Sequence, residues 1–234
     1  MTGSSRRDEL AVRLTAVRQR IAAACKAAGR DPAGVTLIAV TKTWPASDVR
    51  LLSGLGVTDI GENRDVEAAP KAAQCADLDL TWHFIGRLQT NKAASVVRYA
   101  TFVHSVDRMR LIRALGTAAR RADRVVQCLI EVSLDGDPAR GGAVASEVPA
   151  LAEALAAEPG LVLAGVMAIA PLGMAPPEAF ARLLDSAAVV RAVRPAATVI
   201  SAGMSGDLED AVAAGATHVR IGTALLGDRE PAVR

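Results

Sequence analysis

Short apolar runs rich in β-branched residues alternate with longer amphipathic segments along most of the chain, and this pattern restricts the fold more than any other feature. The short runs are typical of buried strands, whereas the longer segments have the apolar spacing of helices. Strands that alternate with helices predict a parallel sheet covered by helices. The predicted strands cover residues 35–41, 58–61, 81–85, 102–105, 125–132, 163–169, 198–201 and 218–221.

Eight such strands favour a closed (β/α)8 barrel over an open doubly wound sheet. The predicted helices between and after the strands cover residues 46–55, 64–76, 89–97, 108–121, 146–157, 177–194 and 208–214. An extra N-terminal helix, at about 6–28, carries the apolar stripe Leu10, Leu14, Val17 and Ile21, as a core-facing helix does. The α/β chain is therefore predicted to be one domain over 1–234, a TIM-type barrel at about 35–228 preceded by this helix.

The composition argues against several functional classes. A formal net charge of +2 in 234 residues, without a basic block interleaved with aromatics, gives no reason to expect a nucleic-acid partner. No uncharged run is long enough to span a membrane, and the N-terminus does not resemble a signal peptide. Cys25, Cys75 and Cys128 lack metal-ligand or disulfide spacing, so we expect reduced, packed thiols and no metal. A cytoplasmic protein is the expectation.

Lys42 is the residue of greatest chemical interest, because it directly follows the first predicted strand. An ammonium group at the end of a buried strand must be desolvated or find a partner. The chain has four lysines and takes its other basic residues from arginine. Lysine can lose its proton and form a Schiff base, whereas arginine cannot. A lone strand-end lysine is more often salt-bridged or snorkelling, so Lys42 needs a second signal.

Two glycine-rich segments with hydroxyl side chains supply that signal. Residues 201–207 (SAGMSGD) follow the seventh predicted strand, and residues 220–224 (RIGTA) lie at the end of the eighth. Glycine lets backbone N–H groups approach an anion, and in this fold the loops after strands seven and eight are the usual phosphate site. Closure would pair strand eight with strand one and bring Lys42 beside this site. A reactive lysine beside a phosphate site indicates a ligand that is a phosphorylated aldehyde or ketone, held as a Schiff base. Pyridoxal 5′-phosphate (PLP) is the first candidate and a sugar phosphate is the second.

Other polar residues fall at the same predicted edge. Arg220 is either half of a buried ion pair or a donor to the pyridine nitrogen of PLP. Because arginine stays protonated, the second role would leave the pyridine nitrogen unprotonated and the ring a weak electron sink, so transaminase chemistry is less expected. Asn63 follows strand two and could contact the ring. His83 is a structural hydrogen-bonding residue or a rim residue, and Met167 belongs to the core or to a cofactor wall.

Six segments together resemble the pyridoxal phosphate homeostasis protein family of the YggS type, which is similar to the N-terminal barrel of alanine racemase standing alone. The matching segments are 39–43 (AVTKT), 61–63 (GEN), 83–92 (HFIGRLQTNK), 165–169 (GVMAI), 201–208 (SAGMSGDL) and 219–223 (VRIGT). The resemblance implies that Lys42 carries PLP as a Schiff base and that Arg220 lies near the pyridine nitrogen. It also implies a set of phosphate and ring contacts: Ser201, Ser205, Gly222 and Thr223 at the phosphate, and Asn63 and Met204 near the ring.

A racemase of the related type needs an acid/base on each face of its substrate, and the second one in alanine racemase is a tyrosine from another domain. Tyr99 is the only tyrosine of this chain, and it precedes the fourth predicted strand. The resemblance therefore implies a monomeric PLP carrier that serves vitamin B6 homeostasis and supplies PLP-dependent apoenzymes, with indirect effects on amino-acid and keto-acid metabolism. A weak amino-acid racemase using Lys42 with water or His83, a Schiff-base aldolase for a sugar phosphate, and a partner-binding regulatory module remain as alternatives.

Overall fold

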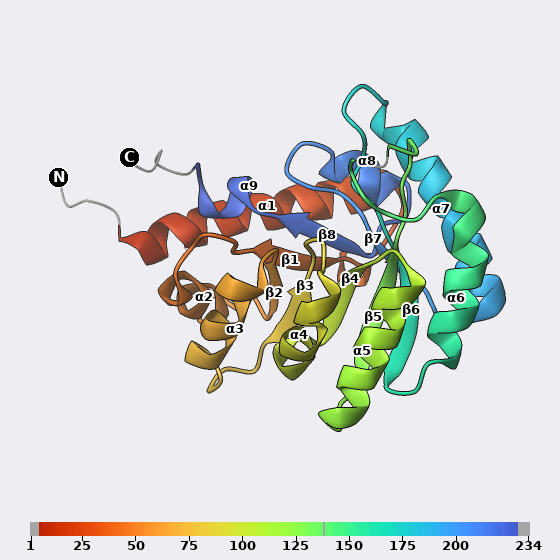
Figure 1. Ribbon diagram of the computed structural model, residues 1–234. Helices are drawn as coiled ribbons and strands as arrows, with labels where there is room; N and C mark the ends of the chain where they lie inside the picture. The colour runs from red at the N-terminus through yellow and green to blue at the C-terminus, as the bar shows by residue number, and fades with distance from the viewer. Residues whose placement is uncertain (1–4, 138, 229–234) are drawn as a thin grey trace.

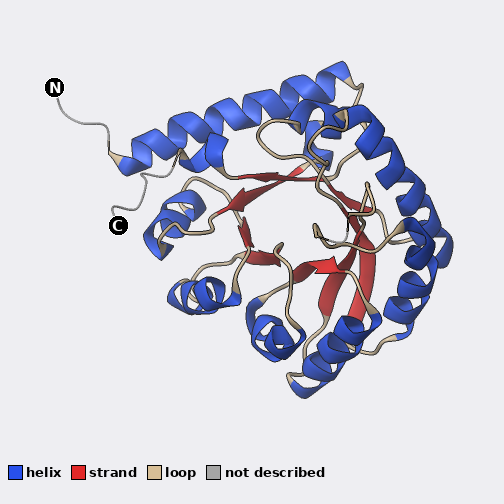
Figure 2. Cartoon of the chain, turned by 45° about the horizontal axis from the view of Figure 1, so that its top comes forward, coloured by secondary structure: helices blue, strands red, loops and turns tan. Residues whose placement is uncertain are grey.

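The computed structural model describes residues 5–137 and 139–228. In this part of the chain eight parallel strands pair in sequence order and close into a barrel, because β8 also pairs with β1 (Figures 1 and 2). The predicted (β/α)8 barrel is thus confirmed, while residues 1–4, 138 and 229–234 of the predicted domain lie outside the described residues. The strands are β1 (Thr36–Val40), β2 (Asp59–Glu62), β3 (Thr81–Phe84), β4 (Phe102–Val106), β5 (Val126–Glu131), β6 (Leu161–Met167), β7 (Val199–Ser201) and β8 (His218–Ile221).

Helices surround this ring of strands on the outside (Figure 2). Most match the predicted segments, but residues 89–97 divide into the short 3-10 turn Thr90–Lys92 and a later helix. One further helix, of four residues after β8, was not predicted, because so short a segment shows no periodicity. The α-helices are α1 (Arg6–Ala27), α2 (Ala46–Ser53), α3 (Asp65–Gln74), α4 (Ala93–Tyr99), α5 (Met109–Arg121), α6 (Val148–Ala157), α7 (Pro176–Val193), α8 (Leu208–Ala213) and α9 (Thr223–Leu226).

The predicted N-terminal helix is α1, and it covers the barrel beside the short α9 (Figure 1). Ser5 caps it, accepting a hydrogen bond from the Asp8 N–H while the Asp8 carboxylate accepts one from the Ser5 N–H. The predicted apolar stripe is buried and belongs to one cluster with residues of α2, α8, α9 and the outer faces of β1 and β8. Helix α1 thus provides the cover that α9 is too short to give.

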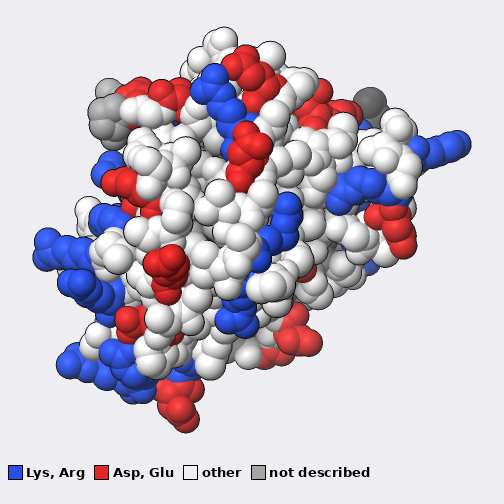
Figure 3. All heavy atoms as spheres, turned by 90° about the vertical axis from the view of Figure 1, so that its right-hand side faces the viewer, with Lys and Arg blue, Asp and Glu red and all other residues white. Residues whose placement is uncertain are grey.

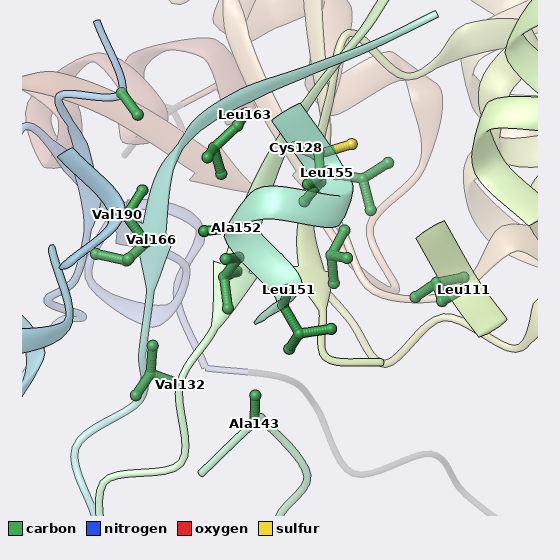
Figure 4. Packing of buried hydrophobic residues seen from close by; sticks show 14 of the residues in the cluster. Leu111, Cys128, Val132, Ala143, Leu151, Ala152, Leu155, Leu163, Val166 and Val190 are labelled. Carbon is green, nitrogen blue, oxygen red and sulfur yellow. The ribbon is translucent and has the colours of Figure 1, made fainter. Parts of the chain in front are cut away.

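Apolar residues between the strands and the helices form most of the core. Figure 4 shows this layer around β5 and β6, where Cys128 lies beside Leu155 of α6 and Val166 lies beside Val190 of α7. A smaller cluster contains Leu129, Ala164 and Met167, which alternate with the helix-facing residues and therefore point into the barrel. Met167 is 1% exposed, so it belongs to the core.

Three general properties follow from the described residues. Cys25, Cys75 and Cys128 are free and buried, as expected. Among the helices of residues 5–137 and 139–228, none combines the length and the apolar character that crossing a membrane requires. The face seen in Figure 3 carries acidic and basic side chains, with Lys and Arg gathered toward its lower left edge.

Candidate functional site

A pocket of about 280 Å³ lies where the C-terminal ends of the strands meet. This is the end of the barrel that carries active sites in (β/α)8 proteins. Seven of the predicted site residues line it together, which are Lys42, Asn63, Met204, Ser205, Arg220, Gly222 and Thr223. Gly206, from the predicted phosphate segment 201–207, also lines the pocket, and three apolar lining residues were not predicted, namely Val40, Ile85 and Ile169. These three could have been found from their position along the strands, because their side chains alternate with helix-facing neighbours.

Lys42 reaches the pocket because side chains alternate along its strand and just beyond it. Thr41 is fully buried on the side of α3, so the next residue faces the mouth of the barrel. Within the described residues the ammonium of Lys42 has no carboxylate partner. A lysine that lines a pocket without an ion pair is free to react as an amine once it loses its proton.

The turn after Lys42 is held in a rarely adopted backbone conformation. Thr43 has a φ of 67°, in the left-handed region that β-branched residues seldom occupy. Its N–H donates a hydrogen bond of 2.9 Å to the Glu67 carboxylate, and its hydroxyl donates one of 2.6 Å to the Lys42 carbonyl. Glu67 of α3 thereby fixes where the backbone leaves β1 and where Lys42 begins.

A buried ion pair supports Lys42 from the other side of its strand, and the sequence did not reveal it. Lys71 of α3 donates to the Glu62 carboxylate and donates a 2.8 Å hydrogen bond to the Thr41 carbonyl. The Thr41 hydroxyl donates to the same carboxylate at 2.6 Å. Lys71 is therefore occupied, and Lys42 is the lysine that faces the pocket.

The loop after β7 and the turn after β8 present unused hydrogen-bond donors to the pocket. The N–H groups of Ser205, Gly206, Gly222 and Thr223 have no acceptor among the described residues. Register brings them to Lys42, because Ala39 pairs with Ile221 at the junction of β1 and β8. Several free N–H groups with two hydroxyls form the kind of concave donor set that binds phosphate.

Arg220 provides a positive charge at the floor of the pocket. It is 4% exposed and has no carboxylate within ion-pair distance among the described residues. Its guanidinium donates to the Ser201 hydroxyl at 2.7 Å and to the Ala168 carbonyl at 2.9 Å. Burial lowers the pKa of Arg220 to about 10, so it remains charged near neutral pH. The buried ion pair considered from the sequence is absent among the described residues.

Three predicted site residues do not line the pocket, namely Ser201, His83 and Met167. Ser201 is fully buried, and its hydroxyl lies between Arg220 and His104, at 2.7 and 3.0 Å. The structure therefore places it beneath Arg220 rather than among the phosphate donors. His83 points into the barrel, where its ring nitrogens lie 2.9 Å from His104 and from Asp59. Neither His83 nor Met167 lines the pocket.

Asn63 carries an unsatisfied polar atom at this site. Its Oδ1 atom is buried and has no hydrogen-bond partner among the described residues. Gly86 lets the chain pass close to it, since a Cβ atom at Gly86 would lie 2.1 Å from the Asn63 carbonyl oxygen. Buried polar atoms normally have partners, so this atom points to a ligand that supplies one.

A larger hollow lies elsewhere, between α4 and α5, and measures about 820 Å³. It is lined by Arg98, Arg110, Arg113 and Arg121, and none of the predicted pocket residues reaches it. Lys42 and the free N–H groups lie at the smaller pocket, so chemistry rather than size identifies the candidate site. In the described residues no group of three or more His, Cys, Asp or Glu side chains could hold a metal ion.

The residues of the small pocket suit PLP on three structural grounds. An unpaired lysine amine matches the aldehyde, a set of free N–H groups matches the phosphate, and the unsatisfied Asn63 amide and the Arg220 cation match polar atoms of the ring. A sugar phosphate would use the amine and the phosphate donors, but it has no aromatic ring nitrogen for Arg220.

Comparison with known proteins agrees with a PLP-binding barrel. The model of the alanine racemase N-terminal domain matches residues 12–230. The pyridoxal phosphate homeostasis protein of Mycobacterium tuberculosis is 44% identical and covers 96% of this chain and 94% of its own length. PipY of Synechococcus elongatus, solved with PLP bound, is 36% identical with a TM-score of 0.82, covering 93% of this chain and all of PipY.

The alanine racemase of Corynebacterium glutamicum shares the fold at 17% identity and a TM-score of 0.68. The similarity covers 94% of this chain and 63% of the racemase. The fold, the pocket and the near full-length similarities lead to one assignment. The chain belongs to the pyridoxal phosphate homeostasis proteins, within the alanine racemase N-terminal domain family.

Proposed function

We propose that this chain binds PLP through a Schiff base on Lys42 and holds it as an intracellular reserve of the cofactor. The observation that carries the proposal is the placement of an unpaired lysine beside a set of free phosphate donors in one pocket. PLP, when bound, supplies a reactive aldehyde and an electron-withdrawing ring. PipY, a relative with the same fold, has been solved with PLP.

Different residues of the pocket would contact different parts of the cofactor. Gly222, Thr223 and Ser205 would bind the phosphate with backbone and hydroxyl donors, and Met204 would cover the ring from the same loop. Arg220 would donate to the pyridine nitrogen, and because arginine stays protonated the ring nitrogen would not be. Such a ring withdraws electrons weakly, which suits retention of the cofactor better than carbanion chemistry.

The arrangement of acid/base groups favours a carrier over a fast racemase. Tyr99 donates to Asp65 and packs edge-on against Trp82, away from the pocket. His83 uses both ring nitrogens inside the barrel, so it is not available to a substrate. Within the described residues neither of these groups can stand opposite Lys42.

The visible spectrum of the purified protein, before and after borohydride reduction, tests the proposal. We expect a yellow band that disappears on reduction, and a phosphopyridoxyl group on Lys42 in the peptide map. Lys42→Ala should abolish the label, whereas Lys92→Ala, which changes an exposed lysine, should retain it. A colourless protein that does not take up added PLP would contradict the proposal and favour the sugar-phosphate aldolase.

Glu131 supports a second candidate, a weak amino-acid racemase. It lines a cavity of about 250 Å³ that shares Ile169 with the Lys42 pocket. Burial, with a smaller effect of Asp107, raises the pKa of Glu131 to about 7, which is a suitable value for an acid/base group. Slow alanine racemisation that is lost in Glu131→Gln but not in the exposed control Glu153→Gln would favour this candidate.

The proposal extends to location and partners. We place the protein in the cytoplasm as a monomer that gives PLP to PLP-dependent apoenzymes, without nucleic acid or metal. Size-exclusion chromatography with light scattering tests the monomer. Transfer of PLP to an apoenzyme across a dialysis membrane, compared with direct mixing, tests whether transfer requires contact.

A further inference from the structure

The inside of the barrel contains a continuous row of buried hydrogen bonds that ends at Arg220. Asp59 Oδ1 lies 2.9 Å from His83 Nε2, and His83 Nδ1 lies 2.9 Å from His104 Nε2. His104 Nδ1 lies 3.0 Å from the Ser201 hydroxyl, which lies 2.7 Å from Arg220. His83, His104 and Ser201 are at most 1% exposed, so water does not compete for these contacts.

The two ends of this row fix its direction. Arg220 has only donors, so the Ser201 oxygen accepts from it and the Ser201 proton is left for His104 Nδ1. His104 then carries its proton on Nε2 and donates to His83 Nδ1. His83 in turn carries its proton on Nε2 and donates to Asp59, which accepts as a carboxylate.

The charges around the row agree with two neutral histidines. Burial lowers the pKa of both His83 and His104, although Asp59 opposes this effect at His83. Burial acts to raise the pKa of Asp59, but hydrogen bonds from His83 and Thr58 lower it overall, which keeps the carboxylate charged. Among the described residues His218 of β8 also lies beside the rings, and burial lowers its pKa to about 4.

The row connects the two mouths of the barrel. Asp59 begins β2, its side chain is 22% exposed, and it lines a separate hollow of about 380 Å³ at the N-terminal ends of the strands. Arg220 lies at the floor of the Lys42 pocket at the opposite end. Bonds that all point the same way polarise one another, so the carboxylate strengthens the hold of Ser201 on Arg220.

We propose that Asp59, His83, His104 and Ser201 form a one-way hydrogen-bond relay that positions Arg220 from the far end of the barrel. These are positioning residues, since they act through Arg220 and do not line the pocket. The relay rests on the proposed function only for its effect on PLP, because its direction and its hold on Arg220 exist without the cofactor.

Nitrogen NMR of the cofactor-free protein tests the relay directly. At neutral pH we expect His83 and His104 as neutral tautomers with the proton on Nε2, and separate guanidinium signals from a restrained Arg220. Asp59→Ala should mix the tautomers of both rings and average the Arg220 signals. Asp59→Asn should restore both, because an amide oxygen can still accept from His83. Asp79→Ala, at an exposed position before β3, is the matched control.

Binding measurements then connect the relay with the cofactor. Asp59→Ala and Ser201→Ala should each release PLP about two- to tenfold faster, the range of one ordinary hydrogen bond. Wild-type rings with the proton on Nδ1, charged rings at neutral pH, or Arg220 signals that do not respond to Asp59→Ala would overturn the relay. A wild-type protein with the expected tautomers that does not bind PLP would instead refute the proposed function and leave the relay standing.

Discussion

Lys71 donates a 2.8 Å hydrogen bond to the backbone carbonyl of Thr41, the residue that precedes the pocket lysine. A helix on the outside of the barrel is thereby joined to the strand end from which Lys42 projects. The same ammonium pairs with the fully buried Glu62. The position of Lys42 thus depends on a charged pair that never reaches the pocket.

Removal of Lys71 should be costly for stability. Lys71→Met leaves the Glu62 carboxylate buried without its cation, for which about 3–5 kcal/mol of unfolding free energy is the expected loss. Urea unfolding followed by circular dichroism measures this loss, with the exposed Lys92→Met as control. Adding Glu62→Gln to Lys71→Met should recover part of it. If Lys71→Met proves as stable as wild type, the pair is not the support described above.

The phosphate donors should discriminate between PLP and pyridoxal. Ser205→Ala and Thr223→Ala each remove a hydroxyl from the pocket, so each should weaken PLP binding about tenfold, as expected for one bond to a charged group. Pyridoxal has no phosphate, and its binding should change little. Fluorescence or absorbance titration with both compounds measures the difference, and Ser47→Ala, at an exposed position in α2, serves as control. Equal weakening of both ligands would place the phosphate elsewhere.

Gly86 should not tolerate a side chain. In Gly86→Ala the new methyl would lie 2.1 Å from the Asn63 carbonyl oxygen, so the loop that carries Asn63 must move. We expect a loss of about 1–3 kcal/mol in stability together with weaker PLP retention. Gly34→Ala is the matched control, because a Cβ atom there meets nothing within 4 Å. Undiminished PLP retention in Gly86→Ala would show that Asn63 does not depend on this contact.

Glu131 should make stability fall as pH rises toward neutrality. Its pKa is about 7 in the folded protein against an ordinary value of 4.5, so the unfolded chain releases the proton first. Between about pH 4.5 and 7 this difference favours unfolding increasingly, and the loss is complete above pH 7. Glu131→Gln should therefore gain more stability relative to wild type at about pH 8 than at about pH 4.5, as measured by urea unfolding. Glu153→Gln should give the same difference at both pH values.

The strands and the placement of Lys42 could be predicted because local pattern determines both. An apolar run followed by a lysine is visible in the sequence, and the closure of eight strands brings Lys42 to the segment around Gly222. The support of Lys42 could not be predicted in this way. Lys71 and Glu62 meet only because α3 packs across β2, and nothing in the sequence distinguishes either of them from a charged residue in contact with solvent.

Ser201 illustrates a second limit. Its segment predicted a phosphate contact, but the side chain alternates inward one step below the mouth of the barrel and meets Arg220. A one-residue difference in depth along a strand separates a residue that contacts a ligand from a residue that supports one. His104 was overlooked for a related reason, since a histidine within an apolar strand gives no sign of the histidine on the neighbouring strand.

Closure of the barrel between β1 and β8 also sets the order in which the pocket can come into being during synthesis. The ribosome makes Lys42 early, whereas Arg220, Gly222 and Thr223 follow only after seven strands have been made. A nascent chain that ends before β8 would contain the amine and the donors of Ser205 and Gly206, but it would lack those of Gly222 and Thr223 and the Arg220 guanidinium. The complete pocket can therefore form only after β8 has been made and has paired with β1.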